Sequence, residues 1–501
     1  MTRPNIIFIL VDDLGWAEPG CYGNSFNETP HIDGLAESGV RFTDAYASSV
    51  VCSPSRAGLL TGQAPPRNGI TDYLRPWSDW YLPLSSRSHP PADTELPEDT
   101  EFRMDPQHLT MAQMFKECGY TTGIIGKWHL SGYNKNGVKY GPSKYGFDEV
   151  LISEQTGIGS GSYFHPYTKV DPTIEPKLGE NEYLVDRMNY EAVEFIKRHK
   201  EEPFFLYLSH YAVHTTLDAK DEDIEYFSQK REKVTEDANS EGEEQVPKSK
   251  KTRKYLKFLI KLMDLINPLK WGEFKKNKQK WFNKNNPVLA AMLKSIDQGV
   301  GKIVTTLKEL GLYENTMIVF TSDNGGDPWV TQNGHLSAGK SFTYEGGLRV
   351  PLIISYPKHI TSNIIKAPTT NLDFYPTFAE LIGYDIPRST TIDGSSLLPV
   401  LTGEEGQGNN HFAERYLSWH YPRKRRHFLG GRSSAAQRRK NYKYIWFFNE
   451  EKGELFDLAH DESEKSNLAN ELSEKAKTHR KDLRDWLKDV GGTIPKGQKG
   501  P

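Results

Sequence analysis

The stretch Asn5-Ile6-Ile7-Phe8-Ile9-Leu10-Val11 is apolar at every position after Asn5, and Asp12-Asp13-Leu14-Gly15 follows it at once. An unbroken apolar run of this length predicts a strand that is buried on both faces, since a strand with one solvated face would alternate with polar residues. Such strands are typical of parallel sheets covered by helices. The two aspartates then lie at the carboxyl end of the strand, where open α/β sheets bind ligands.

Further segments alternate between strand and helix along the chain. Buried strands are expected at 120–125, 204–208, 316–320 and 350–355, and helices at 32–38, 109–116, 187–200 and 289–310. This alternation predicts an α/β fold in which a large mixed, mostly parallel sheet lies between layers of helices. Short strands at 442–447 and 454–457 predict an antiparallel sheet in a smaller C-terminal α+β subdomain. We expect a main domain over residues 1–400 and the subdomain over 401–501.

Residues 218–286 interrupt this alternation, and we expect an insertion there that is part flexible and part helical. The segment 221–244 is mostly acidic and polar, whereas 255–266 is a lysine-rich amphipathic piece that ends at Asn267-Pro268. Two interpretations of the helical part stay open. It is either a solvated surface helix that docks by its apolar face, or a lid that helps to hold an anionic polymer.

The composition restricts the class of protein. The chain has 501 residues, of which 36% are hydrophobic and 12% aromatic, so it is not an intrinsically disordered chain. Its 63 basic and 66 acidic residues nearly balance, which disfavours a dedicated nucleic-acid binder. Three cysteines without a Cys-x-x-Cys pair exclude a disulfide scaffold and give no sign of a zinc or iron–sulfur site. No apolar run reaches the length of a membrane span.

Two of the predicted strands end in acidic or amide side chains. Asp12 and Asp13 follow the first strand, and Asp323 and Asn324 follow the strand at 316–320. If these strands are neighbours, three carboxylates and one amide meet at the same edge of the sheet. Because the carboxylates repel one another, a cation is the simple resolution, and hard oxygen ligands suit Ca²⁺ or Mg²⁺ rather than zinc.

The segment Cys52-Ser53-Pro54-Ser55-Arg56 carries a reactive side chain. Pro54 suits the first turn of a helix that ends near Gly62, which places Cys52 at the helix N-terminus, where free N–H groups favour anions. An ordinary cysteine at this place is a candidate for an activated thiolate. Together with Thr61-Gly62, the segment resembles the sulfatase signature, Cys-x-Pro-Ser-Arg followed four residues later by Thr-Gly.

The resemblance is to the type I formylglycine-dependent sulfatases, arylsulfatase-like enzymes of the alkaline phosphatase superfamily, and among them to carbohydrate sulfatases. Matching blocks cover nearly the whole chain except the insertion: Pro4–Gly15, Thr29–Asp33, Gly39–Phe42, Gly126–Leu130, Thr321–Gly326, Gly339–Lys340, Tyr344–Pro351 and Glu454–Leu458. The resemblance implies that a formylglycine-generating or anaerobic maturase enzyme oxidises Cys52 to Cα-formylglycine. It also implies that residues 1–400 are the catalytic domain and that 401–501 complete the substrate pocket.

The resemblance implies a role for each matching residue. The expected ligands of the cation, Ca²⁺ in preference to Mg²⁺, are Asp12, Asp13, Asp323, Asn324 and an oxygen of the modified Cys52. Arg56 is expected to stabilise the formylglycine, and His129 to pair with it. Lys127 and Lys340 are expected to contact sulfate oxygens. His214 is expected near the leaving group, in preference to His210.

The reaction that the resemblance implies explains these residue types. A sulfate ester is anionic, and a cation, two lysines and an arginine offset its charge. One hydroxyl of the hydrated aldehyde attacks sulfur and displaces the substrate alcohol; the second is then deprotonated, by His129, and sulfate leaves. The departing alkoxide needs a general acid, and both His214 and Lys340 stay open for that role.

Three residues outside these blocks are candidate substrate contacts. His335 stands where the family more usually has a proline, and His420 and Arg425 belong to a C-terminal cluster of His, Trp and Arg side chains suited to sugar hydroxyls, carboxylates or a second sulfate. With the long insertion, they favour a sulfated oligosaccharide from a polysaccharide as the substrate. The alternatives are a phosphonate or phosphodiester hydrolase, and a catalytically inert sulfoglycan-binding protein with an unmodified Cys52.

A polymer-degrading enzyme meets its substrate outside the cytoplasm. We therefore expect a periplasmic or secreted protein from which a signal peptide has been removed, because no signal-peptide pattern precedes the first strand; a cytoplasmic location is the alternative. No nucleic-acid partner and no membrane span are expected. Cys21 and Cys118 either pair or are both free thiols.

Overall fold

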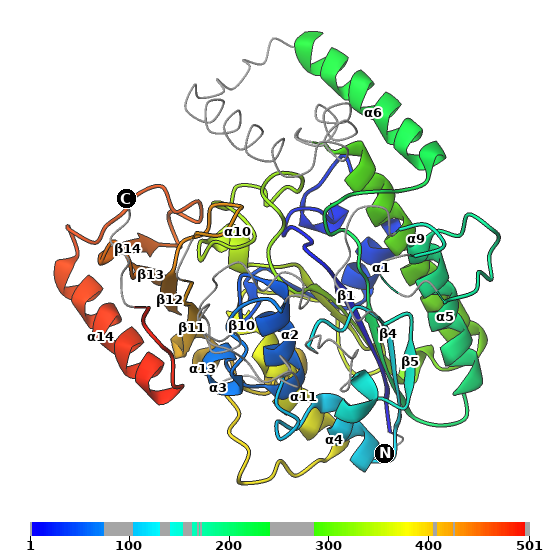
Figure 1. Cartoon of the computed structure of the whole chain (residues 1–501), viewed down its shortest axis with the longest axis horizontal. Helices are drawn as coiled ribbons and strands as arrows, with labels where there is room; N and C mark the ends of the chain where they lie inside the picture. Colours follow the sequence, from blue (N-terminus) through cyan, green and yellow to red (C-terminus); the bar gives the residue numbers. More distant parts are fainter. Residues whose placement is uncertain are drawn as a thin grey trace, which may run out of the picture.

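Eight strands form one large sheet at the centre of the molecule. The computed structural model describes residues 3–74, 104–130, 141–153, 163–167, 170, 173–240, 285–403, 408–423 and 426–495, which Figure 1 draws in colour. In spatial order the strands are β5 (Glu149–Leu151), β4 (Thr121–Gly126), β6 (Phe204–Ser209), β1 (Asn5–Val11), β7 (Thr316–Ser322), β8 (Leu352–Ser355), β2 (Val40–Phe42) and β9 (Asn363–Ile365). Of these eight, β8 alone runs against its neighbours, which confirms the predicted mixed, mostly parallel sheet.

β1, the strand predicted from the apolar run, lies in the middle of this sheet. It pairs in parallel with β6 and β7, so that Ile7 is opposite Leu206 on one side and Ile318 on the other. Its apolar side chains alternate between two hydrophobic cores, with Ile7, Ile9 and Val11 in one and Ile6, Phe8 and Leu10 in the other. Because both faces are buried, every one of these positions has to be apolar.

Helices cover both faces of the sheet (Figure 1). One face packs against α1 (Pro30–Ser38), α5 (Leu184–Arg198) and α9 (Pro287–Glu309), and the other against α2 (Cys52–Thr61), α4 (Met111–Glu117) and α11 (Phe374–Ile382). Local capping signals set two of the helix starts. The side chain of Asn286 accepts from the first N–H groups of α9, and Thr110 forms a capping box with Gln113 at the start of α4.

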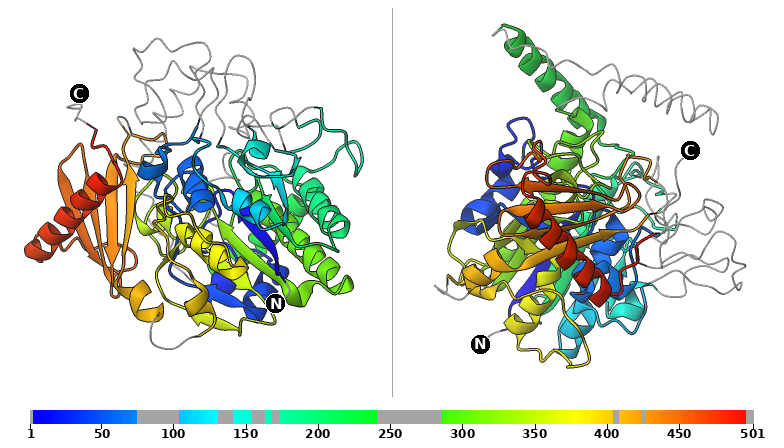
Figure 2. Two further views of the ribbon diagram at one scale, coloured as in Figure 1. Left: turned by 90° about the horizontal axis from the view of Figure 1, so that it is seen from below. Right: turned by 90° about the vertical axis from the view of Figure 1, so that its left-hand side faces the viewer.

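A second, antiparallel sheet makes up most of the C-terminal part. Its strands follow chain order: β11 (Tyr416–Tyr421), β12 (Ser434–Arg439), β13 (Tyr442–Phe447) and β14 (Lys452–Asp457). Helix α14 (Ser473–Asp489) covers one face, and the other face packs on the main body through Tyr46, Val50 and Val51 (Figure 2). The predicted small antiparallel sheet is confirmed, whereas the boundary at residue 400 stays a prediction.

The first part of the predicted insertion is helical. We expected an insertion that is part flexible and part helical, and its acidic, polar segment contains α6 (Asp221–Ser240), a helix of 20 residues. Its first turn carries Asp221, Glu222 and Asp223, which suit the positive end of the helix dipole. α6 packs against α9, where Lys294 bonds Asp223 at 2.7 Å, and then projects from the body (Figure 2). The segment 255–266 lies outside the described residues, so its two interpretations stay open.

Short elements complete the fold. They are β3 (Ala45–Tyr46), β10 (Thr369–Thr370), α3 (Pro65–Asn68), α10 (Glu345–Leu348), α12 (Leu398–Leu401), α13 (Gly408–Glu414) and the 3-10 turns Gly20–Tyr22, Pro142–Tyr145, Tyr313–Asn315 and Asn371–Asp373. No helix within the described ranges is long and apolar enough to cross a membrane. Cys21, Cys52 and Cys118 are all free cysteines, so Cys21 and Cys118 do not pair.

Candidate active site

Four predicted ligands meet where β1 and β7 end. The two strands are in parallel register, with Val11 opposite Ser322, so the residues that follow each strand leave the sheet side by side. The backbone N–H of Asp13 donates to Asp323 Oδ1 at 3.1 Å, and Asn324 Nδ2 donates to Asp13 Oδ1 at 2.7 Å. Asp12 lies beside them, and all four side chains are buried. The sheet thus gathers the acidic cluster that the strand ends predicted.

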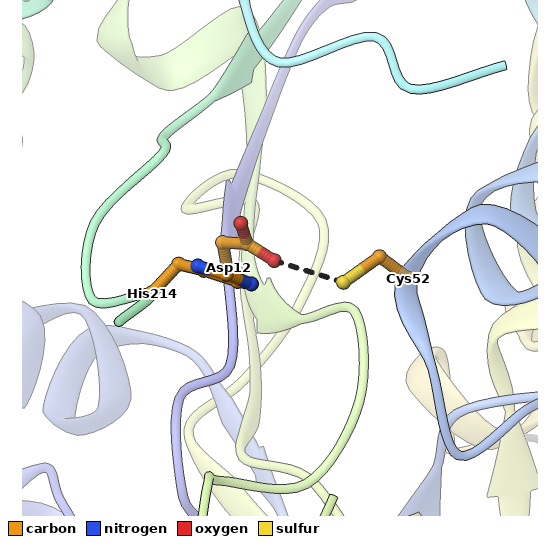
Figure 3. Close-up of side chains that lie close together, drawn as sticks. All are labelled: Asp12, Cys52 and His214. Carbon is orange, nitrogen blue, oxygen red and sulfur yellow. Dashed lines mark hydrogen bonds between the residues drawn. The ribbon is translucent and has the colours of Figure 1, made fainter. Parts of the chain in front are cut away.

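Helix α2 brings Cys52 to this cluster. Val51 is its extended N-cap and Gly62 its left-handed C-cap, with φ 65, so the helix has the predicted bounds. Cys52 Sγ lies 3.3 Å from Asp12 Oδ1 and 3.8 Å from Asp13 Oδ1 (Figure 3). Burial, together with the charges of Asp12 and Asp323, raises the pKa of the thiol well above its ordinary value. This raised pKa disfavours an activated thiolate at position 52.

Arg56 lies one turn further along α2 and is 1% exposed. Its Nε and its Nη2 both lie 2.8 Å from Asp323 Oδ2. Its Nη1 donates to the backbone oxygen of Lys127 at 3.1 Å and to Ser209 Oγ at 2.6 Å. Ser209 was missed by the sequence analysis, although it directly follows the predicted strand at 204–208.

Two lysines from distant parts of the sequence contact the aspartates. Lys127, which follows β4, lies with its Nζ 2.5 Å from Asp12 Oδ2. Lys340 Nζ lies 2.7 Å from Asp13 Oδ2 and 3.7 Å from Cys52 Sγ. Both lysines are buried. Cys52 is thus surrounded by acidic and basic groups at hydrogen-bonding range.

The cluster balances three carboxylates against three cations. Burial alone would raise the pKa of Asp12, but the charges of Lys127, His214 and Arg56 outweigh it and lower that pKa to about 2. The pKa of Asp13 is likewise lowered, mainly by Lys340 against the effect of burial. Asp12 and Asp13 are therefore ionised and available as ligands near neutral pH.

The cluster suits a hard divalent cation. Single ligand atoms of Asp12, Asp13, Cys52 and Asp323 all lie within 4.8 Å of one another. Asn324 Oδ1 is buried and has no hydrogen-bond partner among the residues that the structure describes, so one further oxygen is available to a cation. A dication added to the balanced cluster makes the site net positive, which favours an anionic substrate. The oxygen-rich donor set fits Ca²⁺ or Mg²⁺.

Two histidines border the cluster. His129 is 9% exposed, and its Nε2 lies 2.9 Å from the backbone oxygen of Leu74. Burial, and next the charge of Lys127, lowers its pKa well below the ordinary value. His214 Nε2 lies 3.6 Å from Asp13 Oδ2, and burial with the charge of Lys340 lowers its pKa. In Figure 3 His214 points at Asp12 from the side away from Cys52.

His214 belongs to the cluster around Cys52, and the preference for it over His210 stays a prediction. His214 is one of the residues whose ligand atoms gather with those of Asp12 and Cys52. His210 directly follows β6, is 1% exposed, and burial lowers its pKa to about 3. It is a neutral histidine of the interior.

The predicted substrate contacts do not join the cluster. His335 lies at the surface with its Nε2 2.6 Å from Glu462 Oε2. His420 is buried on the α14 side of β11, where its ring lies 5.9 Å from that of Phe448 and its Nε2 bonds the backbone oxygen of Thr493. Since strand side chains alternate, Trp419 and Tyr421 face the main body and His420 faces away. The burial of His420 speaks against a direct contact with substrate, whereas the contact predicted for His335 stays a prediction, and Arg425 lies outside the described residues.

The comparison with known proteins agrees with this site. A family model described as Sulfatase matches residues 4–384, and one described as N-sulphoglucosamine sulphohydrolase, C-terminal, matches residues 334–491. The steryl-sulfatase of Homo sapiens is 28% identical, in an alignment that covers 84% of this chain and 74% of the relative. The N-acetylgalactosamine-6-O-sulfatase of Bacteroides thetaiotaomicron is 27% identical and covers 94% of this chain and 91% of its own length.

A solved structure has the same fold along almost the entire chain. The crystal structure of Ps i-CgsB is 28% identical, covers 98% of this chain and 94% of its own, and superposes with a TM-score of 0.72. The Sulfatase model spans more than half of the chain and includes the whole charged cluster around Cys52. The chain belongs to the sulfatase family, within the alkaline phosphatase superfamily, and is a hydrolase of sulfate esters.

Proposed function

We propose that this sulfatase removes sulfate from a sulfated carbohydrate, an oligosaccharide derived from a polysaccharide, with a formylglycine made from Cys52 and a bound Ca²⁺. The observation that carries the proposal is the convergence on Cys52 Sγ of Asp12 at 3.3 Å and Lys340 at 3.7 Å, within a buried cluster of three carboxylates and three cations. Because a thiol with a raised pKa is a poor nucleophile, Cys52 is of more use there as the precursor of formylglycine.

The relatives support a carbohydrate substrate. One is named an N-acetylgalactosamine-6-O-sulfatase, and Ps i-CgsB was crystallised with k-i-k-neocarrahexaose, in a structure that covers 100% of this chain at 28% identity. We carry the sulfated-sugar class over to this chain, but neither the sugar nor the sulfated position. We further propose that residues 1–400 form the catalytic domain and that 401–501 complete its substrate pocket.

The chain's own residues supply most of the catalytic environment. Asp12, Asp13, Asp323 and Asn324 would hold Ca²⁺, which would supply positive charge to an anionic sulfate ester. Formylglycine at position 52 has an aldehyde oxygen in place of Sγ. The hydrate of this aldehyde has a hydroxyl that can attack the sulfur of the substrate. Lys127 and Lys340 place two ammonium groups beside that oxygen, where they neutralise sulfate charge. Arg56 holds α2 against the strand ends, so position 52 stays fixed.

Proton transfer falls to the histidines and Lys340. A carbonyl oxygen can only accept, so the bond to Leu74 places the proton of His129 on Nε2 and leaves Nδ1 with the lone pair. Within the described part of the chain Nδ1 is buried without a hydrogen-bond partner, and the lowered pKa keeps the ring neutral, so Nδ1 acts as the base. His214 and Lys340 remain the two choices for the acid that protonates the leaving oxygen.

Mass spectrometry of the peptide around Cys52, from protein made in a host with a formylglycine-generating or anaerobic maturase enzyme, tests the modification. We expect the aldehyde form, and Cys52→Ala should abolish hydrolysis of all sulfate esters. A thiol alone, in protein that binds sulfated glycans without cleaving them, would support the inert binding protein. Rates on matched sulfate and phosphate esters separate the sulfatase from a phosphonate or phosphodiester hydrolase, and a higher rate on phosphate esters would overturn the proposal.

Metal removal tests the cation. Dialysis against EDTA should lower turnover, and Ca²⁺ should restore it more fully than Mg²⁺, because the site offers several carboxylate oxygens without an imposed octahedron. Metal analysis of the purified protein should give about one Ca²⁺ per chain, and Asp323→Asn should lower that content. Full activity and no metal in the EDTA-treated enzyme would contradict the assignment.

Export is tested separately, by fractionation of the native host, with the enzyme expected in the periplasm or medium.

A further inference from the structure

The most exposed large apolar side chain in the described part of the molecule is Phe428, at 63%. It belongs to a tight loop of the C-terminal part, residues 426–431, between β11 and β12. The backbone N–H of His427 donates to the oxygen of Gly431 at 2.8 Å, and that of Gly430 donates to the oxygen of His427 at 2.8 Å. The loop is thus closed by its own backbone and presents Phe428 in a fixed place.

This loop lies directly on the segment that carries Lys340. A Cβ at Gly431 would lie 1.9 Å from the backbone oxygen of Ser341, so only glycine permits this contact. A Cβ at Gly430 would lie 3.0 Å from the ring of Phe342. Ser341 is the neighbour of Lys340, whose Nζ is 3.7 Å from Cys52 Sγ. The loop therefore borders the reaction site on this side.

The loop also reaches the segment that carries Leu74. The ring of Phe428 lies 4.2 Å from that of His427, at 33° between planes, and His427 meets Tyr73 edge-on at 5.7 Å. Tyr73 precedes Leu74, whose backbone oxygen bonds His129 and whose N–H bonds Ser53 Oγ at 3.0 Å. A short series of rings, Tyr73, His427 and Phe428, thus runs from the segment that bonds His129 out to the surface.

A buried arginine fixes the inner end of this series. Arg423 is 4% exposed, its Cζ lies 5.6 Å above the ring of Tyr73, and its Nη1 donates to Tyr421 Oη at 3.0 Å. The same nitrogen lies 3.5 Å from Asp72 Oδ1. Tyr73 and His427 therefore have little freedom, and the outer ring rests on a rigid support.

We propose that Phe428, supported by His427 and Tyr73, is a stacking platform for the sugar unit next to the one that loses its sulfate. A pyranose ring has a face of C–H groups that packs on an aromatic ring, while its hydroxyls stay in water. Only the ring of His427 lies between Phe428 and Tyr73, which precedes the Leu74 that bonds His129. This placement suits the sugar unit next to the reacting unit of the oligosaccharide rather than the reacting unit itself. The inference rests on the proposed carbohydrate function and makes Phe428 a determinant of oligosaccharide over small substrates.

The test compares Phe428→Ala with the wild-type enzyme, both matured in the same host. The substrates are hexasaccharides from carrageenan, chondroitin sulfate and heparin, and 4-nitrophenyl sulfate as a substrate without a second ring. We expect kcat/KM for the preferred hexasaccharide, relative to that for 4-nitrophenyl sulfate, to fall ~3–10-fold, through KM, which is the size of a typical aromatic stacking contribution. Phe428→Trp should restore the ratio.

Ile364→Ala is the matched control, because Ile364 is 52% exposed on β9 and lies outside the site. It should leave the ratio unchanged. Binding gives a second readout: in a Cys52→Ala background, the calorimetric Kd for the same hexasaccharide should rise by a similar factor when Phe428 is also replaced.

Two results would overturn the platform. One is a hexasaccharide KM and Kd that Phe428→Ala leaves at wild-type values; the other is an equal loss on 4-nitrophenyl sulfate, which would indicate a general effect on the site. If the wild-type enzyme cleaves 4-nitrophenyl sulfate but none of the hexasaccharides, the carbohydrate function itself fails, and the platform fails with it. Hexasaccharide cleavage that is insensitive to Phe428 would reject the platform alone.

Discussion

Arg56 shows at the scale of one residue how the site is held together. Its guanidinium bonds Asp323 after β7, Ser209 at the end of β6 and the backbone oxygen of Lys127 after β4. One side chain on α2 thus ties three strand ends to the helix that carries Cys52. Because the charge is fully desolvated, it depends on these partners, and they depend on it.

Arg56→Ala should therefore lower both the stability of the fold and the catalytic activity. Removing one partner of a buried ion pair leaves an uncompensated charge on Asp323, and we expect a loss of about 3–5 kcal/mol in the free energy of unfolding. Activity on every sulfate ester, including 4-nitrophenyl sulfate, should disappear. Urea unfolding followed by tryptophan fluorescence measures the first effect.

Arg198→Ala is the control for this prediction. Arg198 bonds Glu149 at 2.6 Å, but it is 44% exposed, so its loss should change the free energy of unfolding by no more than about 1 kcal/mol. Equal destabilisation by the two substitutions would show that burial of Arg56 does not set its contribution.

The sequence could predict the central residues of the site but not its periphery. Asp12, Asp13, Asp323 and Asn324 come directly after buried strands, so the sheet itself places them. His420 was expected to face substrate. The register of β11 decides to which face of the sheet this side chain points, and no local sequence pattern reveals that register. Phe428 was missed because its role depends on the loop that carries it, in which His427 contacts Tyr73 and Gly431 contacts Ser341, both far away in sequence.

At the scale of elements, α1 depends on another helix for its start. Thr29, at its N-cap, makes no side-chain capping bond. Instead Asp297 of α9 accepts from the N–H groups of His31 and Ile32, at 2.9 and 2.8 Å. The carboxylate thus caps α1 from outside and joins the two helices on one face of the sheet.

This cap should make stability depend on pH. Burial raises the pKa of Asp297 from 3.8 to about 6, against the opposing effect of the two N–H bonds. The folded state holds the proton more tightly, so this stabilisation is complete below about pH 3.8 and is lost as the pH rises through about 6. Asp297→Asn keeps an accepting oxygen without the charge, and should gain stability relative to wild type between pH 4 and 7.

The gain has an upper limit of about 3 kcal/mol, given by the size of the pKa shift. Thermal or urea unfolding of both proteins across that pH range measures it, with Asp385→Asn as the control for loss of one carboxylate at an exposed position. A constant difference between Asp297→Asn and wild type from pH 4 to 7 would contradict the assignment.

Element prediction succeeded where one local signal dominates. Apolar runs predicted the buried strands. The antiparallel direction of β8 could not be predicted, because the connection that precedes the strand sets its direction. The sequence predicted a partly helical insertion but could not locate α6, because a composition rich in acidic and polar residues is also typical of a flexible segment. The packing of α6 on α9 stabilises this helix, and no local pattern reveals that packing.

At the scale of the whole molecule, the C-terminal sheet is joined to the main body by a buried ionic network as well as by apolar packing. Lys443 on β13 is 0% exposed, and its Nζ lies 2.8 Å from Glu345 Oε1 of α10 and 3.0 Å from Glu464 Oε1. Burial would raise the pKa of Glu345, but the charges of Lys443, Arg349 and Arg438 lower it to about 2. The charge of Glu345 is thus held mainly by Lys443, from the C-terminal part.

Lys443→Met should weaken this junction strongly. It leaves two carboxylates together without their shared cation, and we expect about 3–5 kcal/mol of destabilisation, seen as a lower midpoint in urea unfolding. Lys477→Met on α14 removes an exposed lysine, 72% accessible, and should stay within about 1 kcal/mol of wild type. Similar midpoints for the two variants would mean that the network contributes little to joining the parts.

The burial of Cys52 has a consequence for how the protein is made. The side chain is 2% exposed in the folded chain, beneath strand ends and lysines that come from segments hundreds of residues apart. A second enzyme that oxidises this side chain, as we propose, has to reach it before those segments assemble. Maturation and folding therefore compete in time, and a chain that folds first is committed to remaining inactive.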